Sequence, residues 1–190
     1  MILPIRAFGD PVLRKVGKDI DKDYPELKEL IENMFETMHG ANGIGLAAPQ
    51  VGLDIRLFVI DVSPLAEDED YADIAEELKD GRKVFINAKI LEESGEEWKF
   101  NEGCLSIPEV REDVKRKETI VIEYLDENFV KHKETFSDIR ARVIQHEYDH
   151  IEGILFTDHL SALKKKLVKG KLQKITKGEV DVNYKMRFPK

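Results

Sequence analysis

The chain has 190 residues, 42% of them hydrophobic and 36% charged, with a formal net charge of −8. This composition is typical of a folded protein, and the length fits one domain, residues 1–190, built on one hydrophobic core. The acidic balance argues against general nucleic-acid binding, which depends on an excess of Lys and Arg. No run of residues approaches the roughly 20 apolar residues that span a bilayer, and Pro4 interrupts the start before a signal-peptide core could form. We therefore expect a cytoplasmic protein without membrane association.

The first predicted element is an amphipathic helix over residues 25–40. Its apolar residues follow three-and-four spacing, with Pro25 suited to the first turn and Gly40 to the end; they are Leu27, Leu30, Ile31, Met34, Phe35 and Met38. A glycine-containing loop, residues 43–52, leads into the apolar run 57–60, which predicts a buried strand.

The middle of the chain predicts antiparallel sheet interrupted by an acidic insert. Residues 64–82 carry eight acidic side chains and one basic pair, which predicts a solvated surface insert that is helical at most in part. After it, short β-rich runs at 84–86, 89–91, 98–100, 119–122 and 129–130 alternate with turn signals. Residues 118–136, turning at 126–128, predict a hairpin.

Two further helices are predicted towards the C-terminus. Ser137 is a suitable N-cap and Gly153 a suitable end, with helical spacing of Ile139, Val143, Ile144 and Ile151 between them. Residues 160–190 predict a lysine-rich C-terminal helix and tail. Because helices and strands do not alternate strictly, the order favours an α+β fold with mostly antiparallel sheets over a parallel α/β fold.

The strongest chemical signal is the sequence His146-Glu147-Tyr148-Asp149-His150 on the first of these two helices. Histidines four residues apart share one helix face, so both imidazoles can bind one metal ion, and the intervening Glu147 can reach a water on that ion. The alternative is a pair of ordinary hydrogen-bonded histidines. A catalytic site of this kind needs a third protein ligand and an open position.

Cys104 is the best candidate for the third ligand. The long metzincin pattern is excluded because Phe156 occupies the position of its third histidine. Glu179 is the other candidate, but it lies in the lysine-rich tail. Cys104 is the only cysteine, so it cannot form an internal disulfide, and it directly follows Gly103 and the predicted strand 98–100. Its thiolate is a good ligand for zinc or ferrous iron.

Three other readings of these residues stay open. A zinc peptidase would use Glu179 and not need Cys104, whereas a thiol hydrolase would use Cys104 as nucleophile and need no metal. A structural metal site would require four protein ligands and would leave Glu147 without a role.

Four motifs, in sequence order, resemble those of the peptide deformylase family. They are Asp10-Pro11-Val12-Leu13-Arg14, the run from Gly43 to Gln50, Glu102-Gly103-Cys104-Leu105-Ser106, and Gln145 to His150. The resemblance covers residues 4–160 apart from the acidic insert, and favours the bacterial type because no transit peptide is visible.

The resemblance implies an activity and a cofactor. Enzymes of this family remove the N-formyl group from the initiator methionine of nascent chains and release formate. The implied cofactor is one divalent metal ion, naturally Fe²⁺, with Zn²⁺, Ni²⁺ or Co²⁺ as substitutes, bound to Cys104, His146 and His150. Cysteine and histidine ligands suit all four metals, so the sequence does not distinguish them.

The resemblance also implies roles for further residues. Glu147 moves the proton, while the Gln50 side-chain amide and the Leu105 backbone N–H donate to the oxyanion. Ile44 and Gly45 line the substrate cleft. Taken alone, Gln50 reads as an ordinary polar loop residue.

Arg111 resembles the family arginine that contacts the substrate backbone, and its alternative role is a solvated surface charge. His39, His132 and His159 match no motif and are expected to be surface or structural histidines.

The tail carries a local positive charge on an acidic protein. Residues 160–177 contain seven lysines and no acidic residue: Lys164, Lys165, Lys166, Lys169, Lys171, Lys174 and Lys177. We expect Leu160, Leu163 and Leu167 to dock this helix on the body, with a break at Gly170. The outward lysines could then bind ribosomal RNA phosphate near the emerging substrate. The alternative is an ordinary solvated helix face.

Overall fold

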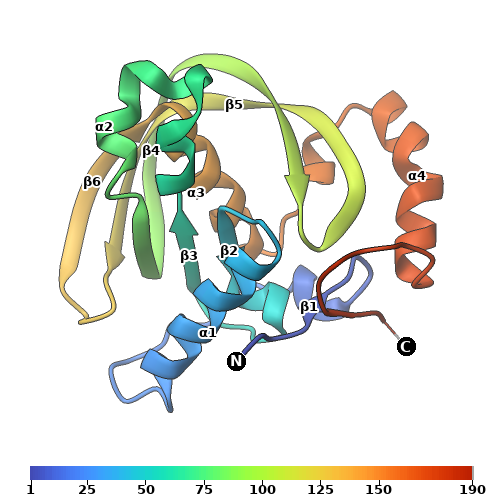
Figure 1. Cartoon of the computed structure of the whole chain (residues 1–190), viewed down its shortest axis with the longest axis horizontal. Helices are drawn as coiled ribbons and strands as arrows, with labels where there is room; N and C mark the ends of the chain where they lie inside the picture. Colours follow the sequence, from blue (N-terminus) through green and yellow to red (C-terminus); the bar gives the residue numbers. More distant parts are fainter. Residues whose placement is uncertain (190) are drawn as a thin grey trace.

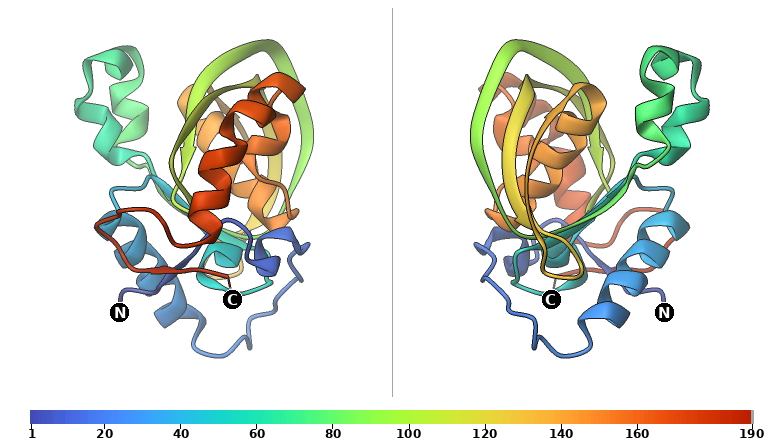
Figure 2. Two further views of the ribbon diagram at one scale, coloured as in Figure 1. Left: turned by 90° about the vertical axis from the view of Figure 1, so that its right-hand side faces the viewer. Right: turned by 90° about the vertical axis from the view of Figure 1, so that its left-hand side faces the viewer.

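The computed structural model describes residues 1–189 (Figure 1). Its main feature is an antiparallel sheet of five strands in the order β2-β3-β4-β5-β6. The strands are β2 (Gly45–Ala47), β3 (Leu57–Asp61), β4 (Arg82–Cys104), β5 (Ile107–Leu125) and β6 (Lys131–Ser137). Helix α3 (Asp138–Ile151) lies inside the curve of the long β4–β5 ribbon in both views of Figure 2. This arrangement confirms the predicted α+β fold with antiparallel sheet around one helix.

The first helix, α1 (Leu27–Gly40), packs its apolar face against β2 and β3. It begins two residues later than predicted. Glu26 has a left-handed backbone with φ of 53°, so Pro25 lies before the helix rather than in its first turn. The short 3-10 helices η1 (Pro11–Arg14) and η2 (Ala48–Val51) flank this region.

The separate strands predicted at 84–86, 89–91 and 98–100 form one strand, β4, which pairs with β5 through several shifts in register. Most residues of β4 beyond Leu91 are exposed, so polar residues continue the strand where the apolar pattern ends. The predicted strand at 129–130 was wrong. The Asp126 carboxylate accepts the backbone N–H groups of Asn128 and Val130, which builds a turn, and β6 begins only at Lys131.

The acidic insert is helical over most of its length, which the prediction of partial helix understated. It consists of η3 (Ser63–Glu67), η4 (Glu69–Ile74) and α2 (Ala75–Leu78). Leu78 is fully buried, and Leu65, Tyr71 and Ile74 pack against the same core. These scattered apolar side chains hold the insert on the body while its acidic side chains face solvent.

Helix α3 begins directly after Ser137 and ends before Gly153, as predicted, but the expected capping hydrogen bond is not formed. The Ser137 hydroxyl does not cap it and instead lies 3.1 Å from the Thr119 hydroxyl. The Asp138 carboxylate accepts the Arg140 backbone N–H at 3.0 Å. At the other end Gly153 has φ of 72°, and a Cβ there would lie 2.7 Å from the Arg14 carbonyl oxygen. Only glycine fits this position.

The C-terminal helix, α4 (Ala162–Thr176), packs on β5 through a face that the sequence analysis did not predict. Leu160 is buried before the helix, but Leu163 and Leu167 are 68% and 69% exposed. The buried residues are Val168 and Ile175, and the helix continues through Gly170 without a break. The predicted docking face was therefore wrong.

After α4 the chain turns back towards the N-terminus. Strand β7 (Met186–Arg187) pairs in parallel with β1 (Ile5–Arg6), so segments close to the two ends of the sequence lie side by side. The 3-10 helix η5 (Phe156–His159) connects α3 to α4. Across residues 1–189, no helix has both the length and the apolar character needed to cross a bilayer.

Candidate active site

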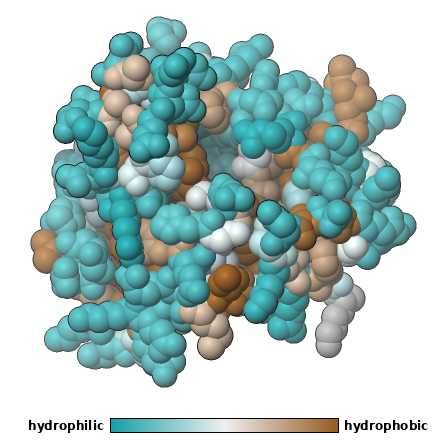
Figure 3. Space-filling view, viewed as in Figure 1, coloured by the Kyte–Doolittle hydropathy of each residue, from teal (hydrophilic) through white to brown (hydrophobic). Residues whose placement is uncertain are grey.

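A cleft of about 790 Å³ lies between the start of β2, the β4–β5 turn and α3. The face shown in Figure 3 is hollowed in this region and is otherwise mostly hydrophilic. The cleft brings together eight of the residues singled out from the sequence: Ile44, Gly45, Gln50, Cys104, Leu105, Arg111, His146 and Glu147. His150 lies below its floor and is 1% exposed.

Three potential metal ligands meet at the base of the cleft. The ligand atoms of Cys104, His146 and His150 all lie within 4.8 Å of one another. Helix α3 presents both histidines from one face, and the end of β4 presents the Cys104 sulfur, which is 3.3 Å from His150 Nε2. Glu179 is not part of this cluster. Burial and the neighbouring His146 lower the pKa of His150 to about 3, so its imidazole stays neutral, the form that binds a metal.

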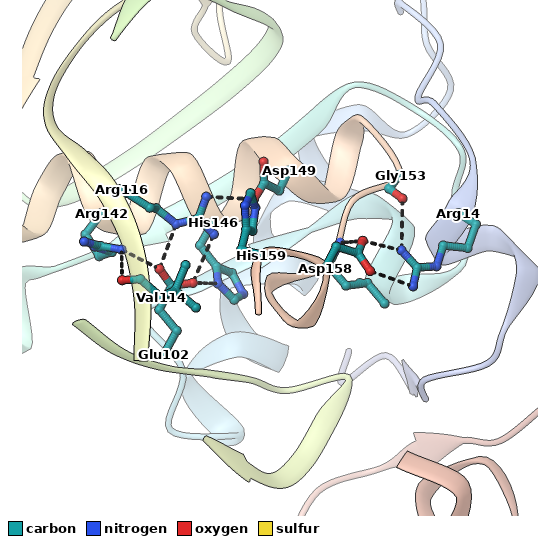
Figure 4. Close-up of polar contacts among 11 residues, drawn as sticks. Arg14, Glu102, Val114, Arg116, Arg142, His146, Asp149, Gly153, Asp158 and His159 are labelled. Carbon is teal, nitrogen blue, oxygen red and sulfur yellow. Dashed lines mark hydrogen bonds and ion pairs between the residues drawn. The ribbon is translucent and has the colours of Figure 1, made fainter. Parts of the chain in front are cut away.

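Glu102 orients His146 from behind. Its carboxylate lies 2.9 Å from His146 Nδ1 and also accepts two hydrogen bonds from Arg116 and one from Arg142 (Figure 4). Burial opposes the charge of Glu102, but the hydrogen bonds from His146 and Arg116 outweigh it and hold the pKa of this carboxyl well below its usual value. Because Nδ1 donates to the carboxylate, Nε2 is left free to face the cluster.

The same network continues to the surface. Arg116 donates to Asp149 at 2.8 Å, and Asp149 lies 2.8 Å from His159 Nε2 (Figure 4). His159 is therefore a structural histidine, as expected. His39 and His132 are likewise paired with carboxylates, those of Asp61 and Asp126, each at 2.8 Å.

Glu147 is buried beside the cluster and is not engaged. Its Oε2 atom has no hydrogen-bond partner among the described residues. Burial raises the pKa of Glu147 to about 7, despite the opposing effect of His146, so this carboxyl can gain and lose a proton near neutrality. The backbone of β2 passes directly over it, and a Cβ at Gly45 would collide with the carboxylate. Glycine at this position lets the strand approach the acid.

Gln50 faces the cluster with its amide nitrogen. Its Oε1 accepts the Ala47 backbone N–H at 2.8 Å, which leaves Nε2 directed at Cys104 Sγ, 3.5 Å away, and at Ser106 Oγ, 3.3 Å away. The side chain is 1% exposed. The Gln50 amide oxygen therefore makes an ordinary loop hydrogen bond, whereas its amide nitrogen points into the site.

Arg111 lies at the rim of the cleft. It is exposed and donates to the Asn101 side-chain oxygen at 2.9 Å and to the Asn101 carbonyl at 2.6 Å, across the β4–β5 ribbon. These bonds hold its guanidinium beside Gly103, next to the candidate ligand Cys104.

Sequence reasoning missed two residues of this site. Glu102 stood in a quoted motif, and a carboxylate two residues before a candidate ligand is a signal that could have identified it. Tyr184 gave no such signal. Its hydroxyl donates to the Leu105 carbonyl at 2.8 Å, and residues 181–184 line the cleft opposite β2. Burial raises the pKa of Tyr184 to about 12, so the hydroxyl keeps its proton.

The α+β fold with a partly buried cysteine, two histidines and a free carboxyl at the base of one cleft defines a small hydrolytic enzyme. Residues 2–166 match the family model described as polypeptide deformylase. A peptide deformylase of Christiangramia forsetii is 66% identical over 190 residues, which cover 100% of this chain and 97% of the relative.

Solved structures agree with this match. A peptide deformylase from Legionella pneumophila has a TM-score of 0.79 and 36% identity, covering 94% of this chain and 98% of its own. The enzyme from Thermotoga maritima has a TM-score of 0.73 and 40% identity, covering 85% of this chain and 99% of its own. The chain belongs to the peptide deformylase family, whose enzymes remove the N-formyl group from nascent polypeptides.

Proposed function

We propose that residues 1–190 form one catalytic domain that hydrolyses the formyl amide at the N-terminal methionine of nascent polypeptides and releases formate, with a divalent metal ion bound by Cys104, His146 and His150. The observation that carries this proposal is the cluster of three ligand atoms within 4.8 Å beside the unpartnered carboxyl of Glu147. Family membership supports the same reaction.

The donor set fits a metal ion. One thiolate and two neutral imidazoles suit Fe²⁺, Zn²⁺, Ni²⁺ and Co²⁺, and we propose Fe²⁺ as the ion used in the cell. When bound, the ion supplies a Lewis acid that acidifies water and polarises the formyl carbonyl. Glu102 contributes by fixing the orientation of the His146 ring.

Glu147 is the proposed proton carrier. Its pKa of about 7 suits it to take a proton from the attacking water and to pass that proton to the amine that leaves. Its unpartnered oxygen is the atom available for this transfer.

Two donors are proposed for the oxyanion that develops on the formyl oxygen. Gln50 offers its Nε2 group, which is held in place by the bond from Ala47 to its own oxygen. Leu105 offers its backbone N–H at the β4–β5 turn. Donors fixed before the reaction stabilise the transition state because they need no rearrangement when the charge forms.

The remaining cleft residues are proposed to bind the substrate. Ile44 and Gly45 line the side of β2, where an apolar methionine side chain could lie, and Arg111 stands at the rim, where its guanidinium could meet peptide carbonyls. The cleft thus extends beyond the proposed position of the formyl group, which leaves room for the rest of the substrate.

Metal content and activity measured together test the proposal. Protein purified without oxygen should contain about one metal ion per chain and should hydrolyse a formyl-methionyl peptide. Cys104→Ser should contain less metal and lose activity by at least about tenfold, because a serine hydroxyl is a poorer ligand than a thiolate. If Cys104→Ser kept tightly bound metal, the ligand set would be wrong. If the metal-free wild type were active, Cys104 would instead act as a nucleophile.

We also propose that the enzyme is cytoplasmic and that the lysines of α4 bind ribosomal RNA. Lys164 pairs with Glu112, but Lys165, Lys166 and Lys169 are exposed. Because residues 181–184 line the cleft, cutting the chain after Leu160 would disturb catalysis as well. Changing Lys165, Lys166 and Lys169 to glutamate should weaken salt-sensitive ribosome binding and spare hydrolysis of a free peptide. Unchanged ribosome affinity of this variant would contradict the proposed role of the α4 lysines.

A further inference from the structure

The segment that follows α4 forms one wall of the cleft. Residues 181–184 line it, although the family model ends at residue 166 and no family motif accounts for them. The segment is anchored directly after Tyr184, where Ile5 donates its backbone N–H to the Lys185 carbonyl at 2.8 Å and Ala7 donates to the Arg187 carbonyl at 2.9 Å. The strand pairing of β1 with β7 therefore fixes the position of the segment that ends in Tyr184.

Tyr184 is one of three residues that hold the turn after Cys104. Gln50 approaches Ser106 from one side, and Phe8 donates its backbone N–H to the Ser106 carbonyl at 2.8 Å. Tyr184 donates its hydroxyl to the Leu105 carbonyl at 2.8 Å. Leu105 itself is only partly buried and faces the cleft, so packing alone does not fix it.

We propose that Tyr184 is a positioning residue for deformylation: its hydroxyl holds the Leu105 backbone so that the N–H of Leu105 points at the developing oxyanion. This inference rests on the role proposed above for Leu105. Tyr184 does not touch the reacting atoms. It acts through the carbonyl of Leu105, one residue from the ligand Cys104.

Small displacements of an oxyanion donor lower the rate of the chemical step, because the hydrogen bond is formed fully only in the transition state. Removal of the Tyr184 hydroxyl leaves the Leu105 carbonyl without this donor and lets the turn relax. We expect the effect mainly in kcat, since substrate binding does not require the oxyanion contact.

Tyr184→Phe tests the inference because it removes one oxygen atom and keeps the ring. With a formyl-methionyl peptide and metal-loaded enzyme, kcat should fall about fivefold, the size expected for one lost hydrogen bond, while KM stays within about twofold. Tyr24→Phe is the matched control, because it removes a tyrosine hydroxyl from a partly buried position outside the cleft, and its kcat should equal that of the wild type.

A second measurement does not depend on the metal. In metal-free protein, the backbone amide of Leu105 should exchange its hydrogen faster in Tyr184→Phe than in wild type, with the same melting temperature for both. Unchanged kcat and unchanged exchange would overturn the inference, as would a rise in KM with kcat unchanged. If the wild type itself failed to hydrolyse the peptide, the proposed function would fail, and that result is distinct from equal activity of wild type and variant.

Discussion

Helices α3 and α4 differ in what decides their orientation. On α3 the histidines, Glu147 and the buried apolar residues all lie towards the interior of the protein, because the candidate site and the core are both on that side. On α4 two apolar stripes exist, Leu163 with Leu167 and Val168 with Ile175, and only the second is buried against β5. When a helix has one apolar stripe, the sequence predicts which face is buried. When it has two, the surface that the helix packs against decides which one is buried.

The largest effect should come from the inner face of α3. Glu147→Ala should lower kcat for a formyl-methionyl peptide by about 10²- to 10⁴-fold and leave the metal content unchanged, because Glu147 moves a proton and is not a ligand. Elemental analysis of the purified variant is the control. Loss of the metal, or retention of most of the activity, would refute this assignment.

The second-largest effect should come from Glu102, which holds the His146 side chain of α3 in place. Glu102→Gln keeps the shape but removes the charge that balances Arg116 and Arg142, both of which are buried. Unfolding in denaturant should show a loss of about 3 kcal/mol, and metal affinity should fall about tenfold as His146 loses its acceptor. The matched control is Glu112→Gln, whose carboxylate pairs with Lys164 on the other helix and whose loss should cost under about 1 kcal/mol. Equal losses from the two variants would show that the buried network behind α3 stabilises the protein no more than the ion pair between β5 and α4.

The smallest effect on activity should come from the acidic insert. No residue of the insert lines the cleft, so replacing residues 66–80 by a short turn should leave hydrolysis of a short formylated peptide within about twofold of wild type. Stability should fall, because Leu78 is fully buried.

Leu78→Ala in the full chain is the control for that experiment, with an expected loss of about 2–4 kcal/mol in unfolding free energy. If the shortened chain folded but lost most of its activity, the insert would have to help shape the cleft.

The sequence predicted which side chains meet at the candidate site better than it predicted the packing. The spacing of His146 and His150 and the isolated Cys104 led directly to the cluster, because ligand geometry restricts which spacings can work. The extent of β4 was missed because its exposed half carries no apolar pattern, and Ser137 was assigned to a cap although its hydroxyl pairs with Thr119 across two strands. Tyr184 was missed for a similar reason: its partner lies 79 residues away, and no local pattern encodes that distance.

The pairing of β1 with β7 has a consequence for synthesis of the enzyme. Residues 5–6 are translated long before their strand partner, residues 186–187. A chain still attached to the ribosome can fold β2 to α3 early, but the wall of the cleft beyond residue 180 forms only after residue 187 has been added and has left the exit tunnel. Contacts between residues so far apart in sequence also form late in folding. A newly made molecule should therefore complete its cleft as one of its last folding steps, and processing of its own chain during synthesis would fall to molecules made earlier.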